Sequence, residues 1–214
     1  SGTPAVGVGQ GNVVTIIDET ADIGDAAAKI SVSKTFDNAT SCSSENSVIA
    51  IETVYGEVVS SLCSEGGLVL SEEEGSRLTD IHWKNGKMTT DLLAQDIDVI
   101  IDKVDLKDRA SKDTKFLILP TNKAGATEVV CGEKMSRFLT LYKVNNIPEA
   151  IELAIQIQEY QGSGHSIGIH TKNYERAHEI AMKAKTCRVI VNQAHCFATG
   201  GFFNNGLPFS LSMG

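Results

Sequence analysis

Apolar and polar residues alternate along this chain in blocks that predict strands and helices in turn. Short apolar runs rich in β-branched residues predict strands, which occupy 13–17, 47–51, 116–119, 138–144, 166–170 and 188–192. Most of the intervening segments favour helices by apolar spacing and capping signals, over 18–34, 54–64, 71–83, 91–103, 148–157 and 174–181. Strands that alternate with helices predict an α/β fold, a three-layer α/β/α sandwich around a mostly parallel sheet.

Local signals refine this pattern. Ser71 and Glu74 have the form of a capping box, and Asn85-Gly86 marks a turn. The tail 194–214 is rich in glycine and asparagine, contains several aromatic residues and lacks periodicity. We expect an ordered functional loop there rather than a disordered end.

Three glycines near the start, Gly7, Gly9 and Gly11, suggest a phosphate-binding loop. A dinucleotide fingerprint needs a strand before its glycines and a helix directly after them, because the helix N-terminus holds the pyrophosphate. Here the glycines precede a predicted strand, and the Gly-Lys-Ser/Thr of a Walker loop does not follow. The segment therefore predicts a tight turn that leads into the domain.

Composition narrows the possible partners. The chain has 214 residues and a formal net charge of -8, and the absence of a basic cluster argues against nucleic-acid binding. Apolar runs of membrane-spanning length and a secretory leader are absent as well, so we expect no membrane partner. The five cysteines are scattered without a Cys-x-x-Cys pair, which predicts neither a disulfide framework nor a metal site and favours a reducing cytoplasm.

Cys42 lies among small polar residues in the predicted turn between the helix 18–34 and the strand 47–51. Small neighbours leave room for a substrate at the sulfur, and free backbone N–H groups in such a turn can stabilise a thiolate and an oxyanion. An inert loop cysteine is the alternative interpretation. Cys63, by contrast, falls on the apolar face of the helix 54–64, so we expect it to pack inside.

Several motifs resemble one known family in the same order along nearly the whole chain. They are IIDETADI (16–23), SKTFDN (33–38) with the cysteine turn after it, EKMSRFLTLY (133–142), GSGHSIGIHT (162–171), RVIVN (188–192) and LPFSLSMG (207–214). Together they resemble the CoA-acylating aldehyde dehydrogenases, relatives of the aldehyde half of bifunctional alcohol/aldehyde dehydrogenases. The resemblance implies the catalytic domain of the aldehyde dehydrogenase fold.

By this resemblance, Cys42 aligns with the nucleophile of the family. Its thiolate would attack an aldehyde, hydride would leave for NAD or NADP, and the resulting thioester would pass its acyl group to coenzyme A. The backbone N–H of Cys42 would hold the oxyanion. Hydrolytic members carry Glu-Leu-Gly-Gly where this chain has 7–10, and the missing glutamate, their water-activating base, favours acyl transfer over hydrolysis. The resemblance implies no metal.

Two further residues take roles from the same resemblance. Glu133 matches a glutamate near the nicotinamide ribose, which makes it a cofactor-binding residue; a solvated loop carboxylate is the alternative. His165 matches a histidine implicated in proton handling with coenzyme A, which suits a group that titrates near neutral pH. A histidine hydrogen-bonded to a loop carbonyl is the alternative for His165.

The expected substrate is a small anionic aldehyde, with sulfoacetaldehyde first and acetaldehyde second. Arg137 stands near the Glu-Lys pair, and Asn192, Gln193 and His195 lie in a segment that by resemblance borders the aldehyde channel. Donors without nearby carboxylates suit a sulfonate. The alternative is that Arg137 and His195 face solvent and the amides cap the loop.

Residues 1–214 are expected to form the catalytic, thiol-bearing domain, with the cofactor-binding domain and the C-terminal oligomerisation segment absent from this sequence. The resemblance thus implies a homo-oligomer as the full-length enzyme, in the cytoplasm or within a bacterial microcompartment, and an isolated fragment without activity. Two other classes stay open. One is a cysteine-dependent acyltransferase or thioesterase without redox chemistry, and the other is an inactive interaction domain.

Overall fold

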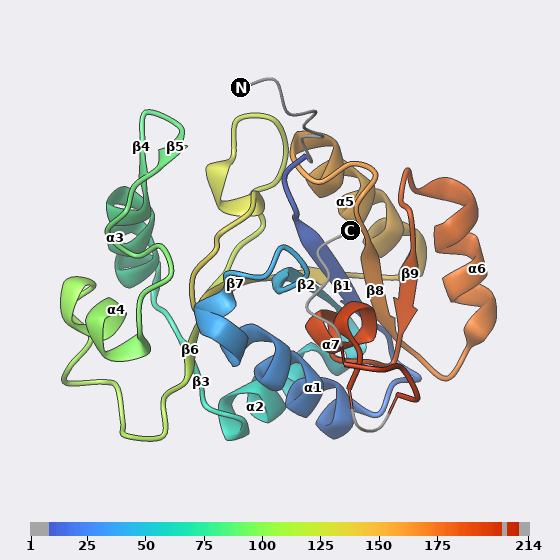
Figure 1. Cartoon of the computed structure of the whole chain (residues 1–214), viewed down its shortest axis with the longest axis horizontal. Coiled ribbons are helices and arrows are strands. Elements are labelled where there is room, and N and C mark those ends of the chain that lie inside the picture. The colour runs from blue at the N-terminus through green and yellow to red at the C-terminus, as the bar shows by residue number, and fades with distance from the viewer. Residues whose placement is uncertain (1–8, 203–204, 210–214) are drawn as a thin grey trace.

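The computed structural model describes residues 9–202 and 205–209, and its centre is one seven-stranded sheet in the order β3-β6-β7-β2-β1-β8-β9 (Figure 1). Every pairing within this sheet is parallel, so the predicted mostly parallel sheet is confirmed. Its strands are β1 (Val13–Ile17), β2 (Glu45–Ile51), β3 (Gly67–Val69), β6 (Phe116–Pro120), β7 (Phe138–Val144), β8 (Ile167–His170) and β9 (Val189–Val191). A small antiparallel hairpin, β4 (Trp83–Lys84) with β5 (Lys87–Met88), stands apart from it.

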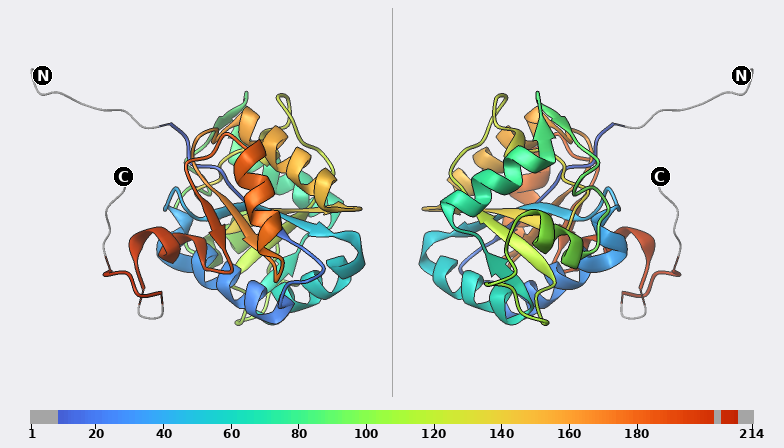
Figure 2. Two further views of the ribbon diagram at one scale, coloured as in Figure 1. Left: turned by 90° about the vertical axis from the view of Figure 1, so that its right-hand side faces the viewer. Right: turned by 90° about the vertical axis from the view of Figure 1, so that its left-hand side faces the viewer.

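Helices cover both faces of the sheet (Figure 2). They are α1 (Ile23–Thr35), α2 (Glu52–Ser64), α3 (Glu72–His82), α4 (Ile97–Lys103), α5 (Ile147–Tyr160), α6 (Tyr174–Lys183) and α7 (His195–Gly200), with short 3₁₀ turns η1 (Phe36–Ala39) and η2 (Val129–Cys131). Alternate residues of one strand face opposite layers. In β1, Val14 and Ile16 pack in the core beneath α5, whereas Ile17 packs beneath α1 and α2. The three-layer sandwich is therefore confirmed.

Local sequence chemistry accounts for several boundaries. The capping box is present, because the Ser71 hydroxyl accepts from the backbone N–H of Glu74 and the Glu74 carboxylate accepts from that of Ser71. The Asn85-Gly86 turn joins β4 to β5 with both residues at positive φ, as a tight hairpin requires.

Some expectations are wrong. Within the tail 194–214, residues 195–200 form the helix α7, which packs against α1, while 203–204 and 210–214 lie outside the described residues. The strand β3 was not predicted either, because its three residues are too few to show a strand pattern. Cys63 is exposed rather than packed.

Candidate functional site

The predicted chemical residues precede neighbouring strands. Glu133 and Arg137 precede β7, Cys42 precedes β2, and His165 precedes β8, with β1 between the last two strands. Because the strands are parallel, their amino ends share one edge, which we call the amino edge. Neighbouring strands lie about 4.8 Å apart, so two strand spacings, roughly 10 Å, separate the positions of Cys42 and His165 along this edge.

A strained turn presents Cys42. Asp37, Asn38 and Ala39 all have positive φ, at 47°, 52° and 60°, and an alanine in this region costs on the order of 1 kcal/mol. Hydrogen bonds hold the turn: the Thr40 hydroxyl donates to the Asp37 carboxylate at 2.7 Å, and the Asn38 amide donates to another loop. Strain of this kind gathers at functional sites, where the surrounding contacts maintain it.

The Cys42 thiol is partly exposed and free. Gly11 lies directly against it, because a Cβ added to Gly11 would be 2.5 Å from the Cβ and from the carbonyl oxygen of Cys42. The following turn closes through the Ser44 N–H, which donates to the Ser41 carbonyl at 2.9 Å. Among the described residues, no acceptor takes the N–H of Cys42 itself. This N–H is therefore available to a bound group.

Glu133 joins the same cluster. The residue is only 8% exposed, so it is not a solvated carboxylate. Burial raises the pKa of Glu133, opposed by a hydrogen bond from the Gly11 N–H and by the positive charges of Lys34 and Lys134. Gly11 thus touches both Cys42 and Glu133 and holds them on one side of the amino edge.

Asn46 connects three strands at this edge, and the sequence motifs gave no role to it. Its amide donates to the Gly11 carbonyl at 3.4 Å and to the Ser44 carbonyl at 3.1 Å, and its oxygen accepts from the Lys134 N–H at 3.0 Å. The register between β1 and β2 shifts here, since Val13 pairs with Glu45 but Val14 pairs with Ser47. Bulges of this kind commonly aim a neighbouring side chain.

Buried charges lie behind the cysteine turn. Burial lowers the pKa of Lys34 to about 8 and raises the pKa of Glu45 to about 7, and each charge partly offsets the shift of the other. Within the described part of the chain, Lys34 Nζ and Glu45 Oε2 have no hydrogen-bond partner. Lys134 is also buried, with Nζ donating to the Gly132 carbonyl at 2.9 Å. Motif reasoning missed these residues, although Lys34 lies within SKTFDN.

His165 is half-buried at the amino end of β8. Its ring nitrogen Nδ1 is 3.0 Å from the Ser166 hydroxyl, and within the described part of the chain the ring has no hydrogen bond to a loop carbonyl. Burial lowers the pKa of His165, and the nearby charge of Arg188 lowers it further. The imidazole is therefore neutral near pH 7 and has a lone pair that can accept a proton.

The four predicted substrate residues do not form one cluster. The Asn192 amide is engaged with the backbone of Thr171, donating to its carbonyl and accepting from its N–H at 2.8 Å each, beyond the carboxyl end of β8. Gln193 is exposed, whereas His195 is buried. Arg137 is partly buried at the amino edge, and its Nε has no partner among the described residues.

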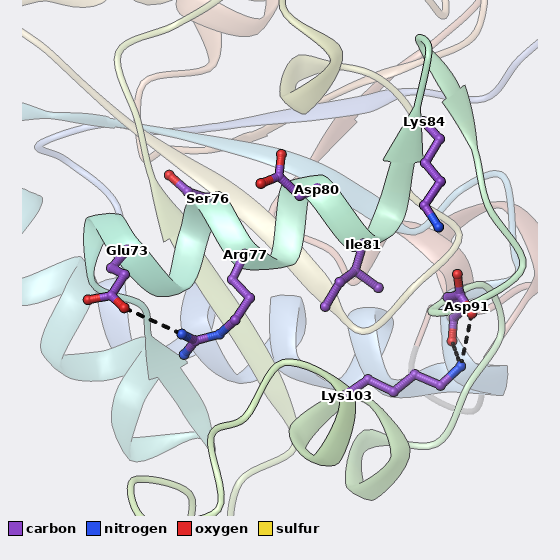
Figure 3. Close-up of a pocket in the computed structure, with 8 residues that line it drawn as sticks. All are labelled: Glu73, Ser76, Arg77, Asp80, Ile81, Lys84, Asp91 and Lys103. Carbon is purple, nitrogen blue, oxygen red and sulfur yellow. Dashed lines mark hydrogen bonds and ion pairs between the residues drawn. The ribbon is translucent and has the colours of Figure 1, made fainter.

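A surface groove of about 670 Å³ lies between α3, the β4–β5 hairpin and α4 (Figure 3). It is lined by Glu73, Ser76, Arg77, Asp80, Ile81, Lys84, Asp91 and Lys103. Two ion pairs, Glu73 with Arg77 and Asp91 with Lys103, already pair four of the charged side chains that line the groove. The groove contains none of the predicted chemical residues.

Two further searches bear on the expectations from sequence. Within 9–202 and 205–209, His, Cys, Asp and Glu form no group that could hold a metal ion. The helices described over the same residues include none long and apolar enough to cross a membrane.

Known proteins resemble this chain in sequence and in fold, although no family model matches it. The sulfoacetaldehyde dehydrogenase (acylating) of Cupriavidus necator is 44% identical over 213 residues, which are 100% of this chain and 43% of the relative. The succinate-semialdehyde dehydrogenase (acetylating) of Clostridium kluyveri is 34% identical over 215 residues, 100% of this chain and 47% of the relative. An acetylating aldehyde dehydrogenase from Geobacillus thermoglucosidasius has a TM-score of 0.86 and 33% identity, over 92% of this chain and 43% of that one.

The parallel sheet with its cysteine turn is thus an aldehyde dehydrogenase fold. Within that class, the chain is similar over its whole length to acylating aldehyde dehydrogenases. It spans less than half the length of the curated relatives that it matches.

Proposed function

We propose that residues 1–214 are the catalytic, thiol-bearing domain of a CoA-acylating aldehyde dehydrogenase, with Cys42 as the nucleophile. The observation that carries this proposal is the Cys42 turn, against which Gly11, without a side chain, packs directly. The proposal assigns the cofactor-binding domain and the oligomerisation segment of a homo-oligomer to other parts of the protein. The free cysteines agree with a reducing cytoplasm.

Cys42 supplies the covalent chemistry. Its sulfur attacks the aldehyde carbon, and the carbonyl oxygen becomes an oxyanion for which the Cys42 N–H is available. Loss of hydride from this adduct leaves an acyl thioester on Cys42. His165 then takes the proton of the coenzyme A thiol, and the freed sulfur attacks the thioester and releases Cys42. The neutral imidazole that its lowered pKa favours suits this role.

A nicotinamide cofactor, NAD or NADP, would accept the hydride when bound. Of the described residues, Glu133 suits a contact with the ribose next to the nicotinamide, because its carboxylate lies beside Gly11 and Cys42. The described residues offer no strand–glycine turn–helix unit for the pyrophosphate. We therefore expect the fragment 1–214 alone to bind the cofactor weakly and to lack redox activity.

The proposed substrate is a small aldehyde with an anionic group, sulfoacetaldehyde before acetaldehyde. Arg137 supports this choice, because its guanidinium is partly buried at the amino edge and its Nε has no partner among the described residues. The relatives named above act on sulfoacetaldehyde and succinate semialdehyde, both of which carry an anionic group. Arg137→Gln should lower kcat/KM for sulfoacetaldehyde more than for acetaldehyde, and an equal loss for both would contradict an anionic pocket.

The deciding experiment measures reduction of NAD(P) by the full-length protein with an aldehyde, with and without coenzyme A. Omission of coenzyme A should leave an acyl adduct on Cys42 that mass spectrometry detects. An acyltransferase or thioesterase without redox chemistry would reduce no nicotinamide and form no acyl adduct from the aldehyde, but would take an acyl group from an acyl-CoA, and an inactive interaction domain would do neither.

A further inference from the structure

A hydrogen-bonded chain runs from the surface into the core at the amino end of β8. The Ser166 hydroxyl lies 3.0 Å from Nδ1 of His165 and 2.8 Å from Nε2 of His195. Ser166 is 0% exposed and His195 is 1% exposed, whereas His165 is half-buried. One buried hydroxyl therefore connects the candidate proton acceptor to a second histidine that a substrate cannot easily reach.

His195 is firmly anchored. Its backbone N–H donates to Glu45 Oε1 at 3.1 Å, and the next N–H, that of Cys196, donates to the Ser33 hydroxyl at 3.0 Å. These acceptors from β2 and α1 satisfy the first N–H groups of α7, whose residue Ala194 provides no side-chain cap. The ring of His195 is thereby fixed relative to β8.

The surroundings keep the His195 ring neutral. Burial, together with the charges of His165, Arg188 and His170, lowers the pKa of His195 to about 3. A neutral imidazole has one donor and one acceptor nitrogen. Its Nε2 can therefore accept a hydrogen bond from Ser166 throughout the working pH range.

We propose that Ser166 and His195 are positioning residues for His165, which hold its proton on Nδ1 and leave the lone pair on Nε2. This inference rests on the proposed function, in which His165 takes a proton from the coenzyme A thiol. Nδ1 is engaged by Ser166, so the accepting nitrogen is Nε2. The Nδ1–H then donates to Ser166 Oγ, and the Ser166 O–H donates to Nε2 of His195. When Nε2 takes the thiol proton, the S–H electron pair stays on sulfur and the Nδ1–H bond remains intact.

The two hydrogen bonds from His165 through Ser166 to His195, which we call the relay, have a measurable consequence. A hydrogen bond donated by a charged imidazolium is stronger than one donated by the neutral ring, so the relay favours protonation of His165. It opposes the effects of burial and of Arg188, the charged group that faces this ring. Removal of Ser166 or His195 should therefore lower the pKa of His165 further, by about half a unit to one unit.

The test uses the full-length protein and reads His165 directly. Carbethoxylation of each histidine, followed by mass spectrometry as a function of pH, gives the pKa of His165. Ser166→Ala and His195→Phe should lower it, while Ser166→Thr and His195→Gln, which keep the hydroxyl and an acceptor, should restore it. His178→Gln on the exposed face of α6 is the matched control. An unchanged His165 pKa in Ser166→Ala overturns the relay, and a change in Ser166→Ala alone refutes the part assigned to His195.

Kinetic measurements on Ser166→Ala distinguish a failure of the relay from a failure of the proposed function. In Ser166→Ala, the first burst of reduced nicotinamide and the KM for aldehyde should stay unchanged, while CoA-dependent turnover falls about three- to tenfold. An equal loss in burst and turnover would assign Ser166 a merely structural role and overturn the relay. A parent protein that shows no CoA-dependent turnover would refute the proposed function, and with it the base role of His165, whereas the carbethoxylation profile would still decide whether the hydrogen bonds exist.

Discussion

Asp18 and Glu45 are both fully buried carboxylates, yet their pKa values shift in opposite directions. Asp18 follows β1 at the carboxyl edge of the sheet, and Glu45 opens β2 at the amino edge; each is 0% exposed. Burial opposes ionisation of Asp18, but hydrogen bonds from Thr171, Thr20 and Arg176 outweigh it and lower its pKa. For Glu45, burial prevails and raises the pKa to about 7.

The partners explain the difference. Asp18 Oδ1 accepts from the N–H and the hydroxyl of Thr20 at 2.7 Å each, and Oδ2 accepts from Arg176 at 2.6 Å. Glu45 Oε2 and Lys34 Nζ have no such partners within the described residues. Both oxygens of Asp18 thus have partners, whereas Glu45, in the part of the chain that the structure describes, accepts only on Oε1, from the His195 N–H. A buried carboxylate with fewer partners is less stable in its charged form and shifts its pKa, which is common at functional sites.

The position of the candidate residues also differs from the usual position of ligand sites in parallel sheets. Ligands of open parallel sheets commonly bind beyond the carboxyl ends of the strands. Here hydrogen bonds and an ion pair occupy that edge around Asp18, and the candidate residues Cys42 and His165 lie at the amino edge. The two edges thus differ, with a fully paired carboxylate at one and the candidate chemical residues at the other.

The largest expected effect follows from removing the thiol at the amino edge. Cys42→Ser in the full-length protein should lower CoA-dependent aldehyde oxidation at least about a thousandfold, because a serine hydroxyl is a much weaker nucleophile at neutral pH. Cys63→Ser, at an exposed position of α2, is the matched control and should keep full activity. Activity of Cys42→Ser within a few-fold of the parent would refute the assignment.

A methyl group behind the thiol should be nearly as harmful. Gly11→Ala places a Cβ about where Cys42 already lies, 2.5 Å from two of its atoms. Displacement of the sulfur by about 1 Å can cost a hundredfold in rate. Gly9→Ala is the control, since a Cβ there meets nothing within 4 Å. We expect a normal rate for Gly9→Ala, and a normal rate for Gly11→Ala would contradict the packing of the turn.

Strong local patterns explain why the sequence predicted part of the sheet correctly. The continuous apolar runs of β1 and β7 gave bounds that the structure reproduces, 13–17 and 138–144. The helix α7 was missed because its six residues, HCFATG, are too short to show a period, and its first N–H groups are satisfied by Glu45 and Ser33 from distant segments. Long-range contacts of this kind leave no local signal.

The site was predictable only in part, for the same reason. Motifs named Cys42, Glu133 and His165, and the structure places all three at strand starts along one edge. Nothing in the pattern indicated that Lys34 or Glu45 would be buried, because charged side chains are ordinarily exposed. The roles themselves remain proposals that the experiments above decide.

Stability against pH should distinguish the two buried carboxylates. The folded pKa of Glu45 is raised from 4.5 to about 7, so the folded state binds its proton more tightly and stability falls as pH rises through this window. Glu45→Gln should remove that fall, leaving stability at pH 8 equal to the parent or higher by up to about 2 kcal/mol. Hydrogen exchange of the β2 peptide at pH 5.5 and pH 8 measures this. A loss of stability at both pH values would show that the partners of Glu45 outweigh the cost of its burial.

Asp18→Asn should behave in the opposite way. The folded pKa of Asp18 is lowered, so its contribution is complete above the unfolded value of 3.8 and is lost as pH falls through the folded pKa. The substitution should therefore cost about 2–4 kcal/mol at pH 5.5 and at pH 8 alike. Hydrogen exchange of the β1 peptide measures this loss of stability. A cost that differs between these two pH values would break the contrast with Glu45.

The smallest effect is expected in α3, the helix that lines the surface groove. Ser71→Ala removes the hydroxyl that accepts from the Glu74 N–H, one of the two hydrogen bonds of the capping box at the start of α3. The loss should be about 1 kcal/mol, seen as faster hydrogen exchange in the first turn of α3. Ser71→Asp, which keeps an acceptor at the same position, should restore the slow exchange. CoA-dependent activity should stay within twofold of the parent in both variants, because no candidate chemical residue lines this groove. A larger loss of activity in Ser71→Ala would show that α3 supports the residues at the amino edge. The contrast between the two edges would then have to include this helix.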